Sequence, residues 1–163
     1  TTWINSLENS RSVRALEMYI NGKKIVGSET FWAVFNTQLR RPEAMALPYE
    51  HFELFPDDKA TRETFSKINL NHDKEMVFEK TVRLSDLDIV NHANNVKYLE
   101  WCLDLADENK IVNQEIESFE MNFMKELSLK DQIVIHENNE QDTSIFSITK
   151  EDKTCFALQL NWK

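Results

Sequence analysis

Apolar and polar residues alternate in the first part of the chain, over residues 11–20 and again over residues 24–36. A period of two is typical of a β-strand, because successive side chains point to opposite faces of a sheet. Asn21 and Gly22 separate the two runs. This pair favours the type I′ turn, whose two central residues both need a positive φ. The pattern therefore predicts a β-hairpin over residues 11–36.

The end of this hairpin is apolar on both faces. Phe31 and Phe35 alternate with Trp32 and Val34, so neither face carries a polar stripe. Strands that are apolar on both faces are typical of sheets that are covered on both sides. We therefore expect this end of the hairpin to be buried, and not to form an exposed edge.

Regular alternation stops between residues 37 and 74. This stretch holds all three prolines of the chain and the acidic pair Asp57-Asp58. Prolines and polar clusters of this kind mark loops and turns. We interpret the stretch as a connector that contains a domain boundary, with a short helix near residues 59–67.

A strand, a helix and four further strands are predicted in the second half of the chain. Leu99, Cys102 and Leu103 recur at the spacing of one helix face. Asn94 or Asn95 can cap the start of this helix, because a side-chain oxygen there accepts from a free backbone N–H group. The helix is predicted over residues 94–108, and the strands over residues 76–84, 117–127, 131–138, 143–150 and 154–162.

Polar side chains crowd the junction between the first of these strands and the helix. Such a cluster is a poor way to build a core, whereas loops held by rigid flanking elements commonly carry binding and catalytic groups. We therefore expect a functional site in this loop. Its polar residues are Asp86, Asp88, Asn91, His92, Asn94 and Asn95.

The run DLDIVNHANNVKY, residues 86–98, resembles the active-site signature of acyl-acyl carrier protein (acyl-ACP) thioesterases, which contain two hotdog domains in one chain. Weaker echoes of the same family are Thr2-Trp3, TQLRRP at residues 37–42 and FEMNFMKEL at residues 119–127. The resemblance implies an α+β hotdog fold, in which a curved antiparallel sheet wraps around a central helix.

The family pattern also implies a domain organisation. Residues 75–163 match a complete C-terminal hotdog domain, and residues 47–74 match the connector. Residues 1–46 supply only late strands of the N-terminal hotdog, which is expected to lack its first half. Its strands would then present an uncovered apolar face, which we expect to pack on the second domain or on another chain.

Three residues match the catalytic aspartate, histidine and glutamate of the family, namely Asp88, His92 and Glu126. A carboxylate beside an imidazole can fix its tautomer and raise its basicity, and burial would raise the pKa of a glutamate towards a useful range. The predicted helix start, at Asn94, Asn95 and Val96, points free N–H groups at the loop, where they can stabilise an oxyanion.

One position departs from the family pattern. Val90 stands where the family has its catalytic asparagine, and Asn91 follows one residue later. Either Asn91 supplies the amide, or that hydrogen bond is missing, which can cost about 10²–10³ in rate. Leu127 stands where some members have a cysteine, so a thiol nucleophile is not expected.

Composition limits the partners and the location. The 163 residues carry a net charge of −9, which disfavours nucleic acid and anionic membranes as partners. No apolar run is long enough to span a membrane and no signal peptide is evident, so we expect a cytoplasmic protein. An acidic carrier protein would need a local basic patch, for which the candidates are Arg11, Arg14, Lys23, Lys24, Arg40, Arg41, Lys59 and Arg62.

The cysteines indicate no metal or redox site. Cys102 and Cys155 lack the spacing of metal ligands, and we expect both to be buried small apolar residues. His51, His72 and His136 lie outside the motif and are expected at the surface. No cofactor is implied by the family pattern.

Three functions remain open. The first is hydrolysis of fatty acyl-ACP thioesters in fatty acid biosynthesis, with acyl carrier protein as the partner. The second is hydrolysis of acyl-coenzyme A, because single-hotdog thioesterases carry a similar loop. The third is an acyl- or carrier-binding module with weakened catalysis, which Val90 favours. The sequence does not specify the length of the acyl chain. We also expect a homodimer formed through the hotdog sheets.

Overall fold

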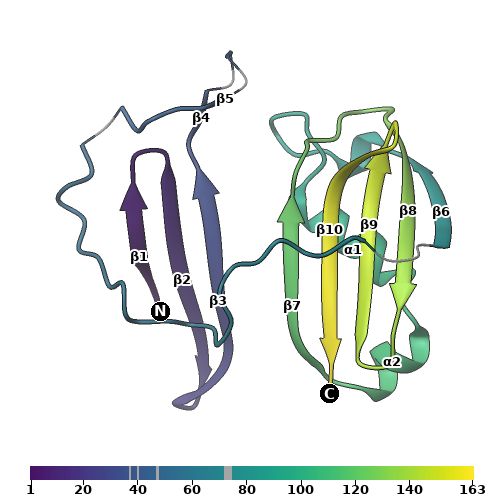
Figure 1. Cartoon of the computed structure of the whole chain (residues 1–163), viewed down its shortest axis with the longest axis horizontal. Coiled ribbons are helices and arrows are strands. Elements are labelled where there is room, and N and C mark those ends of the chain that lie inside the picture. The colour runs from purple at the N-terminus through teal and green to yellow at the C-terminus, as the bar shows by residue number, and fades with distance from the viewer. Residues whose placement is uncertain (37, 40, 47, 72–74) are drawn as a thin grey trace. The chain divides into compact units, whose positions relative to one another are not determined.

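The computed structural model describes residues 1–36, 38–39, 41–46, 48–71 and 75–163, which form two compact units, residues 1–66 and 67–163 (Figure 1). Each unit has its own sheet and is described separately. Thr37 and Arg40, named above for the family echo and the basic patch, lie outside the described residues, as do His72 and the last residues of the predicted connector.

The first unit contains a three-stranded antiparallel sheet in the order β1 (Thr2–Glu8), β2 (Arg11–Ile20) and β3 (Lys23–Ala33). Strands β2 and β3 are joined by a two-residue turn in which Asn21 has a φ of 51° and Gly22 a φ of 77°. Both values are positive, as a type I′ turn requires. The predicted hairpin is therefore confirmed.

Strand β1 was not predicted, because its sequence TWINSLE lacks a clean alternation. It pairs with β2, and a β-bulge between Ile4 and Ser6 interrupts its register. The bulge explains the irregular pattern, since an extra residue shifts the alternation of the faces. Two short strands, β4 (Phe35–Asn36) and β5 (Arg41–Pro42), pair with each other beyond β3.

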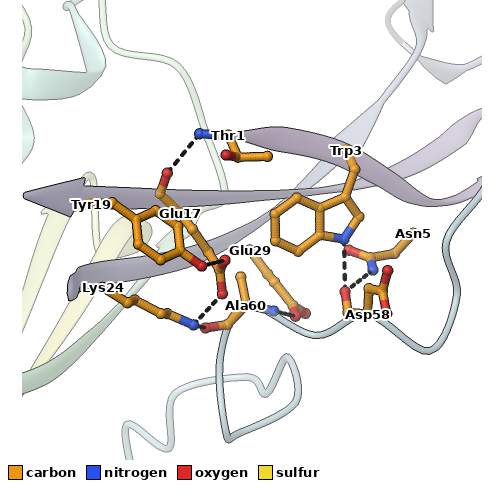
Figure 2. A network of polar contacts seen from close by, with 9 residues as sticks. All are labelled: Thr1, Trp3, Asn5, Glu17, Tyr19, Lys24, Glu29, Asp58 and Ala60. Atoms are coloured by element: carbon orange, nitrogen blue, oxygen red, sulfur yellow. Dashed lines mark hydrogen bonds and ion pairs between the residues drawn. The ribbon is translucent and has the colours of Figure 1, made fainter. Parts of the chain in front are cut away.

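The segment from residue 55 to residue 60 returns along the first sheet and is hydrogen-bonded to it (Figure 2). The Trp3 indole and the Asn5 amide both donate to the Asp58 carbonyl, at 2.7 Å and 2.6 Å. The backbone N–H of Phe55 donates to the Ile4 carbonyl at 2.9 Å, and Asn5 also donates to Phe55. Part of the predicted connector is therefore integrated into the first unit.

Ala60 is the buried residue of this segment, and both of its backbone polar groups are bonded to side chains of the sheet (Figure 2). Its N–H donates to the Glu29 carboxylate at 3.0 Å, and its carbonyl accepts from the Lys24 ammonium at 2.7 Å. Lys24 also forms an ion pair with Glu17. This lysine was a candidate for the basic patch that would bind an acidic carrier protein, and its charge is already paired within the first unit. A Cβ atom on Gly27 would lie 2.1 Å from the Ala60 carbonyl oxygen, so only glycine permits this approach.

Two predictions for the first unit are wrong. No helix forms over residues 59–67, because the backbone groups of Ala60 are bonded to side chains of the sheet. The end of the hairpin is not buried, and Phe31 and Trp32 remain 53% and 59% exposed. The aromatic contact of Phe31 is with Phe65, edge-on at 6.2 Å, and Phe65 is itself 47% exposed, so this contact does not bury the end of the hairpin.

The second unit contains a five-stranded antiparallel sheet in the order β6-β8-β9-β10-β7. Figure 1 shows a helix behind these strands, and a second short helix at one end of the sheet. The strands are β6 (Glu75–Thr81), β7 (Ile116–Phe123), β8 (Gln132–Asn139), β9 (Thr143–Lys150) and β10 (Lys153–Trp162), and the helices are α1 (Asn95–Leu103) and α2 (Glu108–Asn113).

Helix α1 supplies the centre of the core of the second unit. It buries Tyr98, Trp101 and Cys102 against side chains of the sheet that include Phe146 and Phe156. Fully burying side chains of this size contributes about 1.5–3 kcal/mol each before entropy costs. The predicted α+β architecture, an antiparallel sheet packed on a central helix, is confirmed.

The helix is shorter than predicted. It ends at Leu103, and a separate helix begins after Asp107, whose side chain accepts from the N–H of Asn109 at 2.8 Å. An aspartate in this capping position favours a new helix start over continuation of the old one. The preceding strand β6 also ends early, at Thr81, because Leu84–Asp86 forms a 3₁₀ turn.

Both cysteines are free and fully buried, as predicted. Burial raises the pKa of Cys102 to about 12, so this thiol stays protonated and unreactive. Within the described ranges, none of the helices is long and apolar enough to cross a membrane.

Candidate functional site

Asp86 joins the two ends of the polar loop between β6 and α1. This aspartate is buried, and its carboxylate accepts from the N–H of Arg83 at 2.8 Å and lies 3.7 Å from the Lys80 ammonium. Lys80 in turn lies 5.0 Å from the ring centre of Trp101 on α1. The Asp86 carbonyl accepts from the N–H of Asn94 at 2.9 Å. Asp86 therefore ties the strand end to the helix start.

Asp88 organises the middle of the loop. One oxygen of its carboxylate, Oδ1, accepts from the N–H groups of Val90 at 2.9 Å and of His92 at 3.3 Å. Its own N–H donates to the His92 carbonyl at 2.8 Å, and its carbonyl accepts from Asn91. These contacts make Asp88 a scaffold for the turn. The Asp88–imidazole pairing expected from the sequence stays a prediction.

His92 and Glu126 lie together although they are far apart in the sequence. The imidazole Nε2 lies 3.7 Å from the carboxylate Oε2, and the two side chains are 36% and 47% exposed. Ala93, which follows His92, donates its backbone N–H to the carbonyl of Leu127, which follows Glu126, at 2.8 Å. The backbone is therefore also hydrogen-bonded next to the two side chains. Two ionisable groups thus share one water-accessible site.

Val90 and Asn91 lie at the exposed turn of the loop. Val90 is 61% exposed, and Asn91 is exposed at the apex of the turn with a φ of 64°. Asparagine tolerates this left-handed conformation better than most residues. Asn91 therefore fits a conformational role in the turn, and its proposed catalytic role stays a prediction.

The start of α1 is capped by the loop itself. The Asn94 side chain accepts from the N–H of Val96 at 3.0 Å, and its carbonyl accepts from the N–H of Lys97 at 2.8 Å. Val96 is therefore less suited to hold an oxyanion than the sequence suggested, because its N–H already has a partner. Asn95, the exposed first residue of α1, is the remaining candidate donor.

The turn after Glu126 is braced by Asp131. Its carboxylate accepts from the N–H of Ser128 at 2.9 Å and pairs with the Lys150 ammonium at 2.7 Å. Burial opposes ionisation of Asp131, but Lys150 and the Ser128 N–H outweigh it and leave the pKa of Asp131 below its usual value. Asp131 is thus charged at neutral pH and fixes the turn that follows Glu126.

The sequence reasoning did not assign roles to Asp86 or Lys80. The role of Asp86 could have been found from its spacing to Arg83. An acidic residue three positions after the residue that caps a helix can accept from the backbone N–H of that capping residue. Lys80 gave no such signal, since its contact with Asp86 arises only when the strand and the loop fold together. Within the described ranges, no group of three His, Cys, Asp or Glu side chains is placed to hold a metal ion.

The fold is shared with solved structures of known proteins. Over 99% of this chain, it matches an acyl-ACP thioesterase from Bacteroides thetaiotaomicron with a TM-score of 0.88, at 22% identity and 67% of that chain. It also matches the 12:0-ACP thioesterase from Umbellularia californica with a TM-score of 0.80, at 18% identity and 66% of that chain. The fold is therefore a hotdog fold, with one complete hotdog and a partial additional region.

The sequence defines the family. Residues 70–163, more than half of the chain, match the model of the acyl-ACP thioesterase C-terminal domain. The chain belongs to the acyl-ACP thioesterase family, and the resemblance noted from the motif is confirmed. It is similar to the chloroplastic palmitoyl-acyl carrier protein thioesterase of Arabidopsis thaliana, with 28% identity over 112 residues. That alignment covers 64% of this chain but only 27% of the relative.

Proposed function

We propose that this chain hydrolyses fatty acyl-ACP thioesters to free fatty acid, as part of fatty acid biosynthesis. The observation that carries the proposal is the 3.7 Å separation between the His92 imidazole and the Glu126 carboxylate. His92 lies on the loop that carries the family signature, two residues before the Asn94 cap of α1, and Glu126 lies on the segment that follows β7. Family membership supports the same substrate class.

The chemistry requires a water molecule that is activated next to the thioester carbonyl. At 3.7 Å, the imidazole and the carboxylate are close enough to contact one water together. Glu126 takes a proton from that water, and His92 orients the water through its ring nitrogen. The water oxygen then bonds to the carbonyl carbon. When the C–S bond breaks, the proton passes to the leaving thiolate, so the products are a carboxylic acid and a free thiol.

Charge also develops on the carbonyl oxygen of the thioester. The N-terminus of α1 offers the positive end of the helix dipole, and Asn95 is the candidate donor there. Asp88 contributes by holding the turn, so that His92 faces Glu126. Asp88 is in this scheme a scaffold for the histidine.

The test compares thiol release from an acyl-ACP and from the matching acyl-coenzyme A. Wild-type protein is expected to prefer the carrier-protein substrate. Glu126→Gln is expected to lower kcat by at least about 100-fold, in line with loss of a general base. Glu117→Gln, an exposed glutamate on strand β7, is the matched control and should retain activity. Equal rates in Glu126→Gln and wild type would contradict the proposed chemistry.

A second function is favoured by the loop apex. Val90 stands where the family has an amide, and Asn91 is exposed, which supports an acyl- or carrier-binding module with weak turnover. Val90→Asn separates the two functions. A rise in kcat of about 10²–10³ from a near-zero base would favour the binding module. Brisk turnover by the wild-type chain would exclude it.

A further inference from the structure

A buried tyrosine connects helix α1 to the segment that carries Glu126. Tyr98 lies on α1 and is only 3% exposed. Its hydroxyl oxygen accepts a hydrogen bond from the backbone N–H of Leu127 at 3.1 Å. Leu127 is fully buried and directly follows Glu126, beyond the end of strand β7. The phenol therefore takes the place of a strand partner for this peptide group.

Leu127 is held from both sides of its backbone. Its N–H donates to Tyr98, and its carbonyl accepts from the N–H of Ala93 at 2.8 Å. Ala93 follows His92 in the same way that Leu127 follows Glu126. The two bonds thus fix the backbone next to each of the two ionisable side chains, one through the loop and one through the helix.

Tyr98 is itself rigidly held. Its ring centre lies 5.5 Å from that of Trp101, 5.6 Å from that of Phe123 and 5.3 Å from that of Phe156. Burial raises the pKa of Tyr98 to about 12, so the hydroxyl stays neutral over the working pH range. A rigid, neutral hydroxyl is a stable anchor for the Leu127 peptide.

We propose that Tyr98 is a positioning residue that sets the distance between Glu126 and His92 through the Leu127 peptide. This inference rests on the proposed function of the pair. Without the phenol hydroxyl, the buried N–H of Leu127 loses its partner, and the backbone that carries Glu126 shifts to find another. A small displacement of a catalytic group is enough to slow a reaction while substrate binding is retained.

The experiment uses Tyr98→Phe, which removes one oxygen and keeps every ring contact. We expect kcat for an acyl-ACP to fall about 10- to 100-fold, with KM changed less than about twofold. Ser144→Ala is the matched control, because Ser144 is equally buried in the same core and accepts from the Trp162 indole at 3.0 Å. It should lose stability but keep kcat. Equal kcat in Tyr98→Phe and wild type, or equal losses in both variants, would overturn the proposal.

A second measurement does not depend on activity. In the wild type, the Leu127 amide is expected to exchange with deuterium as slowly as the strand amides, although it lies outside the strands. In Tyr98→Phe its exchange should be at least about tenfold faster, because the buried N–H has lost its partner. The NMR signals of the His92 ring should shift in Tyr98→Phe in the direction seen in Glu126→Gln. Fast exchange of Leu127 in the wild type would refute the inference even if the variant failed to fold.

The two readouts separate the two proposals. If the wild-type chain releases no thiol but Leu127 and His92 respond as described, the proposed hydrolysis fails and the positioning role of Tyr98 stands. If thiol is released but Tyr98→Phe changes neither kcat nor these signals, the hydrolysis stands and the inference about Tyr98 is wrong.

Discussion

The two sheets of this chain are stabilised in different ways. In the second unit, α1 buries large aromatic side chains against the strands, and Phe146 and Phe156 are fully inaccessible. In the first unit, the strands β1–β3 are contacted by an irregular segment that binds through backbone and side-chain hydrogen bonds (Figure 2). Among the described residues of the first unit, the buried ones are Asn5, Ala15 and Ala60. Alternation alone therefore predicts strands, but not what covers them.

The largest expected difference concerns matched phenylalanines. Phe156→Ala in the second unit should lower the free energy of unfolding by about 3–5 kcal/mol, because it leaves a cavity in a closed core. Phe31→Ala in the first unit should lower it by less than about 1 kcal/mol, because that ring is half exposed. Chemical denaturation of both variants measures the two values. Similar losses would show that Phe31 is covered in solution and would break the comparison.

An intermediate effect is expected at Gly27. In Gly27→Ala, the new Cβ would lie 2.1 Å from the Ala60 carbonyl oxygen, so the segment from residue 55 to residue 60 must move away. Overpacking of this kind costs about 1–3 kcal/mol. Limited trypsin digestion should then cut faster after Lys59 and Arg62. Ser28→Ala, at the next residue, is the control and should leave the cleavage rate unchanged.

The smallest effects are opposite pH responses in the two units. In the first unit, hydrogen bonds from Lys24 and Tyr19 lower the pKa of Glu17 below its usual 4.5. The stabilisation is complete above that value and is lost as the pH falls through the lowered pKa. The protection factor of the Ala60 amide, that is, its exchange rate corrected for the intrinsic pH dependence of exchange, should therefore fall in acid. Glu17→Gln should weaken this acid dependence, and an unchanged profile would count against the ion pair with Lys24.

In the second unit, burial and then the nearby Asp107 carboxylate raise the pKa of Glu137. The fold then favours the protonated acid, so the penalty is absent below the unfolded pKa and complete above the folded one. Glu137→Gln should raise the free energy of unfolding at pH 7 by less than about 1 kcal/mol, since the partly buried group is still screened by solvent. Thermal unfolding at pH 4 and pH 7 measures it. A variant that is less stable at pH 7 would contradict the sign.

Much of the fold could be predicted because its signals are local. The Asn21-Gly22 turn specifies the hairpin by its backbone conformation, and the last strand is found from its alternation. Strand β1 was missed because it lacks a clean alternation and buries a polar residue, Asn5, whose side-chain N–H group donates to backbone carbonyls far along the chain. The burial of Phe31 and Trp32 was predicted wrongly, because an apolar residue is buried only where another element packs against it.

The candidate site was predictable only in part. The loop from Asp86 to Asn95 was visible as a polar cluster, and Glu126 was found through the family resemblance. The contacts of Tyr98 with Leu127 and of Lys80 with Asp86 could not be read from spacing, because each joins two elements that meet only in the folded unit. The catalytic roles of Asp88, His92, Glu126 and Asn91 stay predictions, and Glu126→Gln tests the role of Glu126 directly.

The turn at Asp88 has a consequence for mutagenesis. A single carboxylate oxygen of Asp88 accepts from two backbone N–H groups there. Any replacement that lacks this acceptor therefore changes the conformation of the loop, whether or not Asp88 takes part in the chemistry. An inactive Asp88→Ala protein would therefore be ambiguous evidence for a proton-transfer role. Asp88→Asn, which retains an acceptor oxygen without the charge, is the informative substitution, and the assignment of chemical roles in this loop depends on that distinction.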